Sequence, residues 1–358
     1  MIERLVLNLR ERDFEADVLT FGKNNSESGI YRAKGKIDFL KLLIKNALKY
    51  DVIYTFDLYT AGFWSWLIGK GWLKKKFVVR FAGDSAWESA SNKGQTGDDL
   101  LVFQKKFYGL SVAWRKFLRK RILLGADKVV AVSEFMKKVA IEIGVSEGRI
   151  KVIYNSVDFV SFPDTYDFLP SFQKRHNLTG DQTILTVGRL VPWKGIDLLV
   201  KALAKINNKK LRLLVVGEGP DLLRLKNLVE EKQLIGQVEF VGKVPLNEVF
   251  EYYMAADVFI LDSQYEGLSH VLLEVLLTGK PIIASRSGGN PEVIGDERNG
   301  LLVDYGNVEQ LVVAIKRMLT EERWHSPEYK EKCRASLKKF NWHNVVEQTS
   351  KVIEELKP

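Results

Sequence analysis

Short runs of β-branched and aromatic residues alternate with amphipathic stretches along almost the whole chain, in two successive series. Strands that alternate with helices indicate parallel sheets covered on both faces. The first series predicts strands at Asp17–Phe21, Asp51–Phe56, Phe77–Ala82, Lys128–Val132 and Ile150–Tyr154. The second predicts strands at Thr183–Val187, Leu211–Val216, Val238–Phe240, Val258–Leu261, Pro281–Ala284 and Leu301–Val303. We therefore expect an α/β protein with two doubly wound, Rossmann-like domains that bind ligands at the carboxyl ends of their strands.

An irregular segment near Ser156–Leu169 separates the two series, because Asp, Pro, Phe and Tyr residues interrupt any regular period there. A length of 358 residues also suits two domains better than one hydrophobic core. The predicted domains are residues 1–160 and 161–341. Within the first, Glu88–Asp99 places glycines among Ser, Asn and Gln. We expect a mobile loop over a cleft there, with a plain surface loop as the alternative.

The first strand of the second series runs into Gly188 and Arg189. A glycine at a strand end lets the backbone approach a ligand closely. Arg189 then stands at the carboxyl end of the strand, and Lys194 opens the next helix. Helix N-terminal amides together with an arginine and a lysine form a binding site for a pyrophosphate. The alternative is that both cations are ordinary surface residues.

A pair of glutamates follows later in the same domain. Glu266 precedes a predicted helix, and Glu274 lies on that helix about two turns further on. The residues around Glu274 are apolar on nearly all sides, which predicts a buried helix. A buried carboxylate needs a partner, and the hydroxyls of a sugar or a ribose would supply one. Solvent-facing carboxylates are the alternative interpretation.

Two further turns contribute to the candidate site. Gly288 and Gly289 precede a helix start at Asn-Pro-Glu, and their amides would face a sugar or a phosphate. A purely structural turn is the alternative. Val241 and Lys243 follow another strand, where a nucleotide base would pack against the backbone. The chain has no Asp-x-Asp pair and no histidine cluster with ligand spacing, so we expect no metal and no cofactor.

The composition suggests a cytoplasmic protein, because Cys333 is the only cysteine and no apolar stretch reaches about 18 residues. The positive net charge is unevenly distributed along the chain. Residues 1–170 contain 28 Lys and Arg against 20 Asp and Glu, whereas the remainder contains 26 against 25. A basic half indicates an anionic partner, either nucleic acid or an acidic membrane surface, and a solvated face without a partner is the alternative.

Aromatic and basic residues are interleaved in the basic half, at 62–76, 105–108 and 114–121. This mixture suits a membrane interface. It also suits nucleic acid, yet no recognised nucleic-acid-binding motif accompanies it. Packing of the aromatic residues in a core is the ordinary alternative. We expect loose attachment to an anionic membrane, with no nucleic acid as a partner.

Taken together, the motifs resemble retaining glycosyltransferase family 4, a large group of nucleotide-sugar-dependent transferases with the GT-B fold. That fold consists of two Rossmann-like domains that face a cleft. The ordered set of motifs is specific, although no single one is. It comprises Gly188-Arg189 with Lys194-Gly195, Val216–Pro220, Phe240–Gly242, Glu266 through Glu274, Gly288-Gly289, Asn155–Asp158 and Phe340–Trp342.

The resemblance implies a role for each candidate residue. Arg189 and Lys194 would bind the diphosphate and stabilise the leaving nucleotide, and Glu266 would contact the hydroxyls of the donor sugar. Glu274 would contact the ribose. Backbone amides of Gly267, Leu268 and Ser269 would face the sugar or phosphate. The C-terminal helix 342–358 would pack on the first domain, and transfer would proceed by a same-face displacement that retains configuration.

Two departures from the family concern the first domain. Residues Met1–Leu9 have the pattern of the helix that follows the family's glycine-rich loop, so the first strand and that loop are expected to be missing. Relatives often have a histidine after the strand Phe77–Ala82, whereas this chain has Asp84 in that region. We predict that Asp84 is a polar residue on the acceptor side, with helix capping as the alternative.

The function expected from these observations is transfer of a hexose from a nucleotide diphosphate-sugar to a lipid-linked or polysaccharide acceptor. The donor would be a UDP- or GDP-sugar, and the product a cell-surface glycan such as lipopolysaccharide or capsule. The alternatives are a non-catalytic nucleotide-sugar-binding protein and a sugar-nucleotide epimerase or phosphorylase of the same architecture. The sequence specifies neither the base, the sugar, the acceptor nor the oligomeric state.

Overall fold

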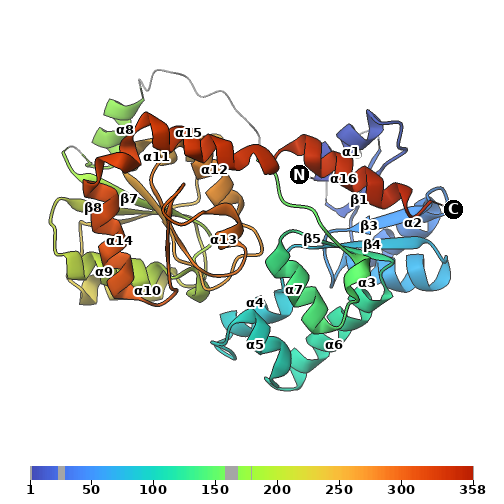
Figure 1. Cartoon of the computed structure of the whole chain (residues 1–358). Coiled ribbons are helices and arrows are strands. Elements are labelled where there is room, and N and C mark those ends of the chain that lie inside the picture. The colour runs from blue at the N-terminus through green and yellow to red at the C-terminus, as the bar shows by residue number, and fades with distance from the viewer. Residues whose placement is uncertain (1, 23–28, 158–167, 179, 358) are drawn as a thin grey trace. The chain divides into compact units, whose positions relative to one another are not determined.

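The computed structural model describes residues 2–22, 29–157, 168–178 and 180–357, and these form two compact α/β units (Figure 1). The first unit comprises Met1–Asn155 with Trp342–Pro358, and the second comprises Ser156–Asn341. The sequence placed the boundary at 160/161. Residues 158–167 of the predicted break lie outside the described residues. In each unit every pairing between strands is parallel, as expected from the alternation of strands and helices.

The first unit contains two separate sheets. The larger sheet has the order β3 (Val52–Thr55), β4 (Lys76–Phe81), β5 (Lys128–Ala131) and β6 (Ile150–Val152). The smaller one pairs β1 (Val18–Phe21) with β2 (Ile30–Ala33). All these strands were predicted except β2, a four-residue strand whose side chains are mostly half-buried and therefore give a weak apolar signal.

A cavity of about 680 Å³ in the first unit is lined by both β1 and β3, which are not paired with each other in the described sheets. Helices α1 (Ile2–Arg10), α2 (Lys36–Ala47) and α16 (Trp342–Glu354) complete its wall. Alternate side chains of β3 pack into two different apolar clusters. Val52 and Tyr54 join the cluster of α1 and α16, and Ile53 joins that of α2. Strand β3 is the edge strand of its described sheet, and its two faces pack against different apolar clusters.

The other helices of the first unit are α3 (Ala61–Trp64), the π-helix η1 (Ser65–Trp72), α4 (Ser85–Asn92), α5 (Leu100–Lys105), α6 (Leu110–Gly125), α7 (Glu134–Ile143) and the short η2 (Glu147–Arg149). Among them, η1 packs on β3 and β4, and α7 packs on β5 and β6. The predicted loop Glu88–Asp99 is wrong in its first half, because Glu88–Asn92 belongs to α4. The physical reason is the cap, since the side chain of Asp84 accepts hydrogen bonds from the backbone amides of Ala86 and Trp87.

The second unit is built on a six-stranded sheet in the order β12-β11-β10-β7-β8-β9. Its strands are β7 (Gln182–Val187), β8 (Leu211–Val216), β9 (Val238–Gly242), β10 (Val258–Leu261), β11 (Ile282–Ser285) and β12 (Leu301–Val303). The chain runs outward from β7 through β8 to β9, then returns to place β10 on the other side of β7. The order therefore reverses between β7 and β10, where ligands bind in folds of this kind.

The helices of the second unit follow the strands in alternation. They are α8 (Leu169–Arg175), the 3₁₀ turn η3 (Pro192–Lys194), α9 (Ile196–Ile206), α10 (Leu222–Glu231), α11 (Val249–Ala255), α12 (His270–Thr278), α13 (Asn290–Val293), α14 (Val308–Thr320), η4 (Glu322–His325), α15 (Pro327–Ser336) and η5 (Leu337–Lys339). None of the helices in the described parts of the chain combines the length and apolar character needed to cross a lipid bilayer.

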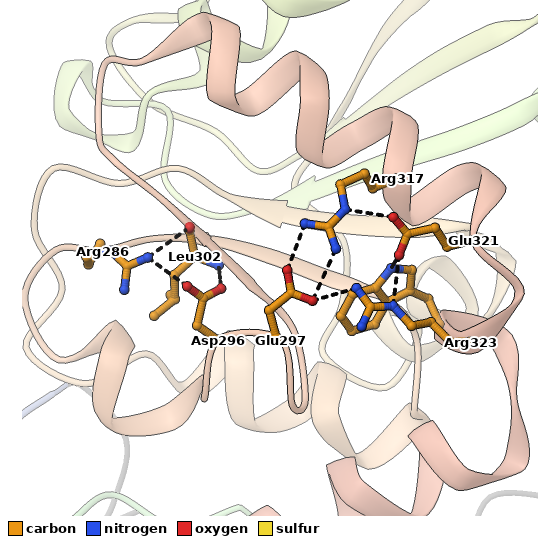
Figure 2. A network of polar contacts seen from close by, with 8 residues as sticks. Arg286, Asp296, Glu297, Leu302, Arg317, Glu321 and Arg323 are labelled. Atoms are coloured by element: carbon orange, nitrogen blue, oxygen red, sulfur yellow. Dashed lines mark hydrogen bonds and ion pairs between the residues drawn. The ribbon is translucent and has the colours of Figure 1, made fainter.

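A network of ion pairs ties the segment before β12 to α14 and η4 on the surface of the second unit (Figure 2). Arg317 on α14 contacts Glu297 at 2.8 Å and Glu321 at 2.7 Å. Arg323 contacts the same two glutamates. Hydrogen bonds from both arginines lower the pKa of Glu321 to about 2. Networks of this kind order a surface, although exposed ion pairs add little stability individually.

Candidate functional site

Lys194 and Glu266 form an ion pair at the reversal point of the second unit's sheet, between Nζ and Oε1. Lys194 ends η3, which follows β7, and Glu266 lies in the segment that follows β10. Both side chains are largely buried, at 19% and 14% exposure. The cation and one of the two carboxylates predicted from the sequence are therefore adjacent. Their residues are 72 positions apart, and the neighbouring positions of β7 and β10 bring them together.

The segment after β7 packs directly on the segment after β10. The amide of Gln264 donates to the carbonyl of Trp193 at 2.8 Å. Gly195 has a φ of +64°, and a Cβ there would lie 1.9 Å from the carbonyl oxygen of Asp262. A side chain at position 195 is thus excluded both by backbone conformation and by space. The glycine after Lys194 lets the two segments approach to backbone contact.

The predicted glycine turn after β11 lies against Glu266. The amide of Gly289 donates to the carbonyl of Glu266 at 2.8 Å, and a Cβ on Gly288 would lie 2.2 Å from the same oxygen. Gly288 has a φ of +59°, which again favours glycine. A Cβ on Gly289 would lie 2.3 Å from the carbonyl oxygen of Gly267. The structure therefore brings Gly288 and Gly289 to the Glu266 segment, as a scaffold for its backbone.

Helix α12 begins next to Glu266. Ser269 is its N-cap and accepts a hydrogen bond from the amide of Leu272 at 3.3 Å. Gly267 and Leu268 precede this cap and are buried. A helix N-terminus carries a partial positive charge and favours anions. The segment Gly267–Ser269 thus places backbone amides and a helix dipole beside the Lys194–Glu266 pair.

Glu274 lies on α12 and is held by Tyr253, a residue that the sequence analysis missed. The hydroxyl of Tyr253 on α11 donates to Oε2 of Glu274 at 2.7 Å. Burial raises the pKa of Glu274, and the Tyr253 hydrogen bond opposes this rise. The carboxylate keeps an acceptor oxygen, Oε1, for a ligand hydroxyl. The apolar run around Glu274 signalled its burial, but nothing in the sequence indicated which hydroxyl would reach it.

The remaining predicted residues line the same edge of the sheet. A Cβ on Gly188 would lie 3.9 Å from Cε of Lys194, so the lysine side chain runs beside this glycine. Arg189 is exposed, and its guanidinium carbon lies 5.6 Å from the centroid of the Trp193 ring. Next to them, the amide of Gly217 donates to the carbonyl of Gly242 at 2.8 Å. Val241 and Lys243 flank Gly242, where β9 ends.

Asp262 is a second residue that the sequence analysis missed. It directly follows β10 and its side chain is 1% exposed. Within the described chain, Oδ1 of Asp262 is buried without a hydrogen-bond partner. Burial, and secondarily the charge of Asp197, raise the pKa of Asp262 to about 7. A polar residue at the carboxyl end of a buried parallel strand is the signal that would have drawn attention to it.

Asp84 lies in the first unit and has structural partners. It caps α4, forms a buried ion pair with Arg119, and accepts a hydrogen bond from Gln104 at 3.2 Å. Its exposure is 0%. The capping alternative therefore describes what this side chain does in the structure. A role for Asp84 toward an acceptor stays a prediction.

The site in the second unit combines chemical groups that suit a polyhydroxylated anion. Lys194 and Arg189 supply positive charge, Glu266 and Glu274 accept hydrogen bonds, and the start of α12 supplies amides. Among the described residues, no three His, Cys, Asp or Glu side chains are grouped closely enough to hold a metal ion.

In comparisons with known proteins, one family model matches each half of the chain. The model described as Glycosyltransferase Family 4 matches residues 1–160, and the model described as Glycosyl transferases group 1 matches residues 169–340. The structure of Anabaena HepE in complex with UDP-glucose is similar, with a TM-score of 0.74 and 20% identity. It covers 91% of this chain and 85% of that one. The GT-B fold predicted from the sequence is confirmed.

Curated relatives match over much of their length. An uncharacterized glycosyltransferase of Methanocaldococcus jannaschii is 32% identical over 69% of this chain and 63% of its own length. The GDP-mannose-dependent alpha-(1-6)-phosphatidylinositol monomannoside mannosyltransferase of Mycobacterium tuberculosis is 31% identical over 60% of this chain and 59% of its own length. The chain thus spans about three fifths of the length of these relatives.

Proposed function

We propose that the chain is a retaining, metal-independent hexosyltransferase, because the family models that match its two halves both describe glycosyltransferases. Its donor would be a UDP- or GDP-sugar, and its acceptor a lipid-linked or polysaccharide glycan of the cell surface. The single observation that carries this proposal is the Lys194–Glu266 pair beside the N-terminus of α12. That place combines a cation for a diphosphate with a carboxylate for sugar hydroxyls.

The ion pair suits a site in which Lys194 and Glu266 would each exchange the other for a group of the donor when the donor binds. Lys194 and Glu266 are 19% and 14% exposed, so each would be costly to leave without a partner. A donor diphosphate would take over Lys194, with Arg189 as a second cation, and the hydroxyls of the sugar would donate to Glu266. The ion pair therefore keeps both charges neutralised until a ligand that carries complementary groups replaces it.

Glu274 suits the ribose of the nucleotide. Its Oε2 already accepts from the hydroxyl of Tyr253, which fixes the direction of the carboxylate, so Oε1 is the oxygen proposed to accept from a ligand. A ribose hydroxyl would donate to Oε1. The raised pKa of Glu274 reflects burial, and a hydroxyl donor would favour the charged form, so donor binding would lower that pKa again.

We propose that transfer occurs on one face of the sugar. The bond between the anomeric carbon and the diphosphate oxygen breaks, and the acceptor oxygen forms a bond to that carbon on the same face. The acceptor proton passes to an oxygen of the leaving diphosphate, which departs as the nucleotide diphosphate. Lys194, Arg189 and the start of α12 would stabilise the negative charge that develops on the leaving group.

The donor proposal draws on the names of similar proteins as well as on the site. One similar structure contains UDP-glucose, and one relative is named for its dependence on GDP-mannose. The same relative acts on a phosphatidylinositol mannoside by its name, which supports a lipid-linked acceptor for this chain. We propose a cytoplasmic protein that attaches to the inner face of the membrane, where it would reach a lipid-linked acceptor.

The proposal is tested by measuring nucleotide release from a panel of UDP- and GDP-sugars, with and without acceptor lipids or glycans. We expect Glu266→Ala to lower turnover roughly 10²–10³-fold, because it removes a group that contacts the reacting sugar. Donor binding, measured by the thermal shift that a ligand produces, should be partly retained. Lys194→Ala should weaken both binding and turnover.

The exposed pair Glu328–Lys332 on α15 provides a matched control, because Glu328→Ala breaks an ion pair of 2.7 Å outside the site. This variant should leave turnover unchanged. Unchanged turnover in Glu266→Ala would refute the assignment of the site. Donor binding without release of nucleotide would indicate a non-catalytic binding protein, and release without any acceptor would indicate an epimerase or a hydrolase.

A further inference from the structure

Helix α6 exposes an apolar stripe to solvent. Leu110, Trp114 and Phe117 are 83%, 64% and 51% exposed. Their spacing of four and three residues places them on one face of the helix, and Arg121 continues that face. The Trp114 and Phe117 rings stack with centroids 5.6 Å apart, and the guanidinium of Arg121 lies 6.0 Å from the Phe117 ring. Three large apolar side chains thus share one exposed face of the helix.

The opposite face of α6 already has its partners, so the stripe does not belong to the core of the unit. Val112, Ile122 and Leu123 are buried there, and α6 packs against α4 and η1. Arg119 on this face is 2% exposed and pairs with Asp84. Lys116 donates to the carbonyls of Phe103 and Gln104 at 2.7 and 3.0 Å. The inward face of α6 is therefore filled by apolar residues and by two cations that have partners, while Trp114 and Phe117 stay outside this packing.

Exposed cations surround the stripe. Lys120 and Arg121 lie at its C-terminal end, and Lys105 and Lys106 lie just before the helix. Phe107 follows these lysines and is 71% exposed, so it extends the apolar surface. Two of the cations have acidic partners: Lys105 contacts Glu142 at 3.5 Å and Lys106 contacts Asp98 at 3.0 Å. Exposed pairs of this kind are weak and leave the cations available to a stronger anionic surface.

We propose that the α6 stripe, defined as Phe107, Leu110, Trp114 and Phe117 with the flanking Lys105, Lys106, Lys120 and Arg121, docks on an anionic lipid membrane. The apolar side chains enter the boundary between headgroups and acyl chains, with the helix parallel to the surface. The cations contact acidic headgroups around them. Tryptophan prefers this boundary because its ring is apolar and its N–H is polar.

Charge complementarity favours a membrane over a protein partner. A protein groove that received the stripe would have to desolvate the surrounding cations or supply a matching ring of acids. An anionic bilayer provides an apolar environment for the stripe and negative charge for the surrounding cations, because its headgroups lie next to its hydrocarbon. The proposal concerns a surface of the first unit, so it does not depend on the chemistry of the donor site.

Sedimentation of the full chain with lipid vesicles tests the proposal. Binding is measured with phosphatidylcholine vesicles, with vesicles that also contain phosphatidylglycerol, and with the latter at high salt. We expect binding to the anionic vesicles, weakened by salt. The double variant Trp114→Ser with Phe117→Ser should weaken it roughly tenfold or more, because two large apolar side chains no longer insert. Lys120→Gln and Arg121→Gln should each weaken it roughly fivefold.

Exposed apolar residues of the second unit provide a matched control. Ile235 and Leu246 are 75% and 74% exposed, and Ile235→Ser with Leu246→Ser should leave vesicle binding unchanged. Circular dichroism of every variant confirms that it is folded. Equal binding by the α6 double variant and the parent, or no binding of the parent to anionic vesicles, would overturn the proposal. Binding to RNA in preference to vesicles would do so as well.

Lipids brominated along their acyl chains provide a positional readout, since they quench tryptophan fluorescence only at close approach. The parent should be quenched on anionic vesicles, and Trp114→Phe should lose most of the quenching while it still sediments with them. Sedimentation without any quenching would mean that the cations alone bind the surface. In that case the insertion of the stripe would be refuted, whatever the donor assays show.

Discussion

Asp262 gives the second unit a pH dependence that can be calculated from its surroundings. The carboxylate is 1% exposed, and one of its oxygens has no partner within the described chain. Burial, with a smaller contribution from the charge of Asp197, raises its pKa from 3.8 to about 7. The ionised form of Asp262 is therefore disfavoured in the folded protein relative to the unfolded chain.

The sign and size of the change in unfolding free energy with pH follow from the linkage between proton binding and folding. Between about pH 4 and pH 7 the folded protein holds a proton on Asp262 that the unfolded chain has released, so the free energy of unfolding falls as the pH rises. The penalty is absent below this interval and complete above it. A rise from 3.8 to about 7 is about 3 pKa units, which corresponds to about 4 kcal/mol at about 1.4 kcal/mol per unit.

Asp262→Asn removes the titration and nearly preserves the shape of the side chain. Urea unfolding of the parent and the variant, at several pH values from about 5 to about 8, gives the difference in unfolding free energy at each pH. We expect this difference to move by about 2–3 kcal/mol in favour of the variant across the range. The buried amide of the variant does not titrate, so it changes the free energy of unfolding by the same amount at every pH. The readout is therefore how the difference in unfolding free energy changes with pH, and not its absolute size.

The exposed carboxylate Glu331 on α15 serves as the control, because Glu331→Gln changes the charge equally and should give a difference that is flat with pH. The histidines are the same in the parent and in each variant, so their contribution to the pH dependence of the unfolding free energy cancels in each comparison. Glu321 does not interfere, because the stabilisation that comes with its lowered pKa of about 2 is lost only as the pH falls below about 4.5. Parallel curves for the parent and Asp262→Asn would refute the assignment of a raised pKa.

Three further outcomes are expected. Asp84→Asn should lower the free energy of unfolding by about 3–5 kcal/mol in urea titrations, because Arg119 is left as an unpaired buried charge; a loss below about 1 kcal/mol would contradict this. Gly288→Ala should cost about 1–3 kcal/mol of stability and weaken donor binding measured by thermal shift, because the new Cβ meets the carbonyl of Glu266. Amides of β3 should exchange with deuterium faster than those of β4, because β3 is an edge strand beside a cavity and β4 is central; equal protection would show that the edge is covered.

The strands could be predicted from the sequence because each buried parallel strand is a short apolar run of its own. Val258–Leu261 and Leu301–Val303 were predicted with their observed bounds, and the helix at Met1–Leu9 is α1. The short β2 was missed because its side chains are only half-buried. The loop predicted from Glu88 was wrong at its start, because a cap at Asp84 outweighs the weak helix propensity of the Ser and Asn residues that follow.

The candidate site could likewise be predicted only in part from the sequence. The sequence identified Lys194, Glu266 and Glu274 by residue type and by the elements expected around them. Their partners could not be predicted, because contacts between distant segments depend on the order of strands in the sheet. The proximity of Lys194 to Glu266 requires β10 to lie beside β7, and the hydrogen bond to Glu274 requires α11 to bring Tyr253 to α12.

The sequence by itself determined that this chain forms parallel α/β domains, and that cations and carboxylates follow particular strands, because local periodicity and composition encode both. Only the tertiary structure decided which of these groups meet. It also decided which face of each helix is buried. Periodicity places Leu110, Trp114 and Phe117 on one side of α6, but the neighbours of the opposite face turn that side outward. Which face is buried depends on packing with distant segments, and that information is spread over the whole chain.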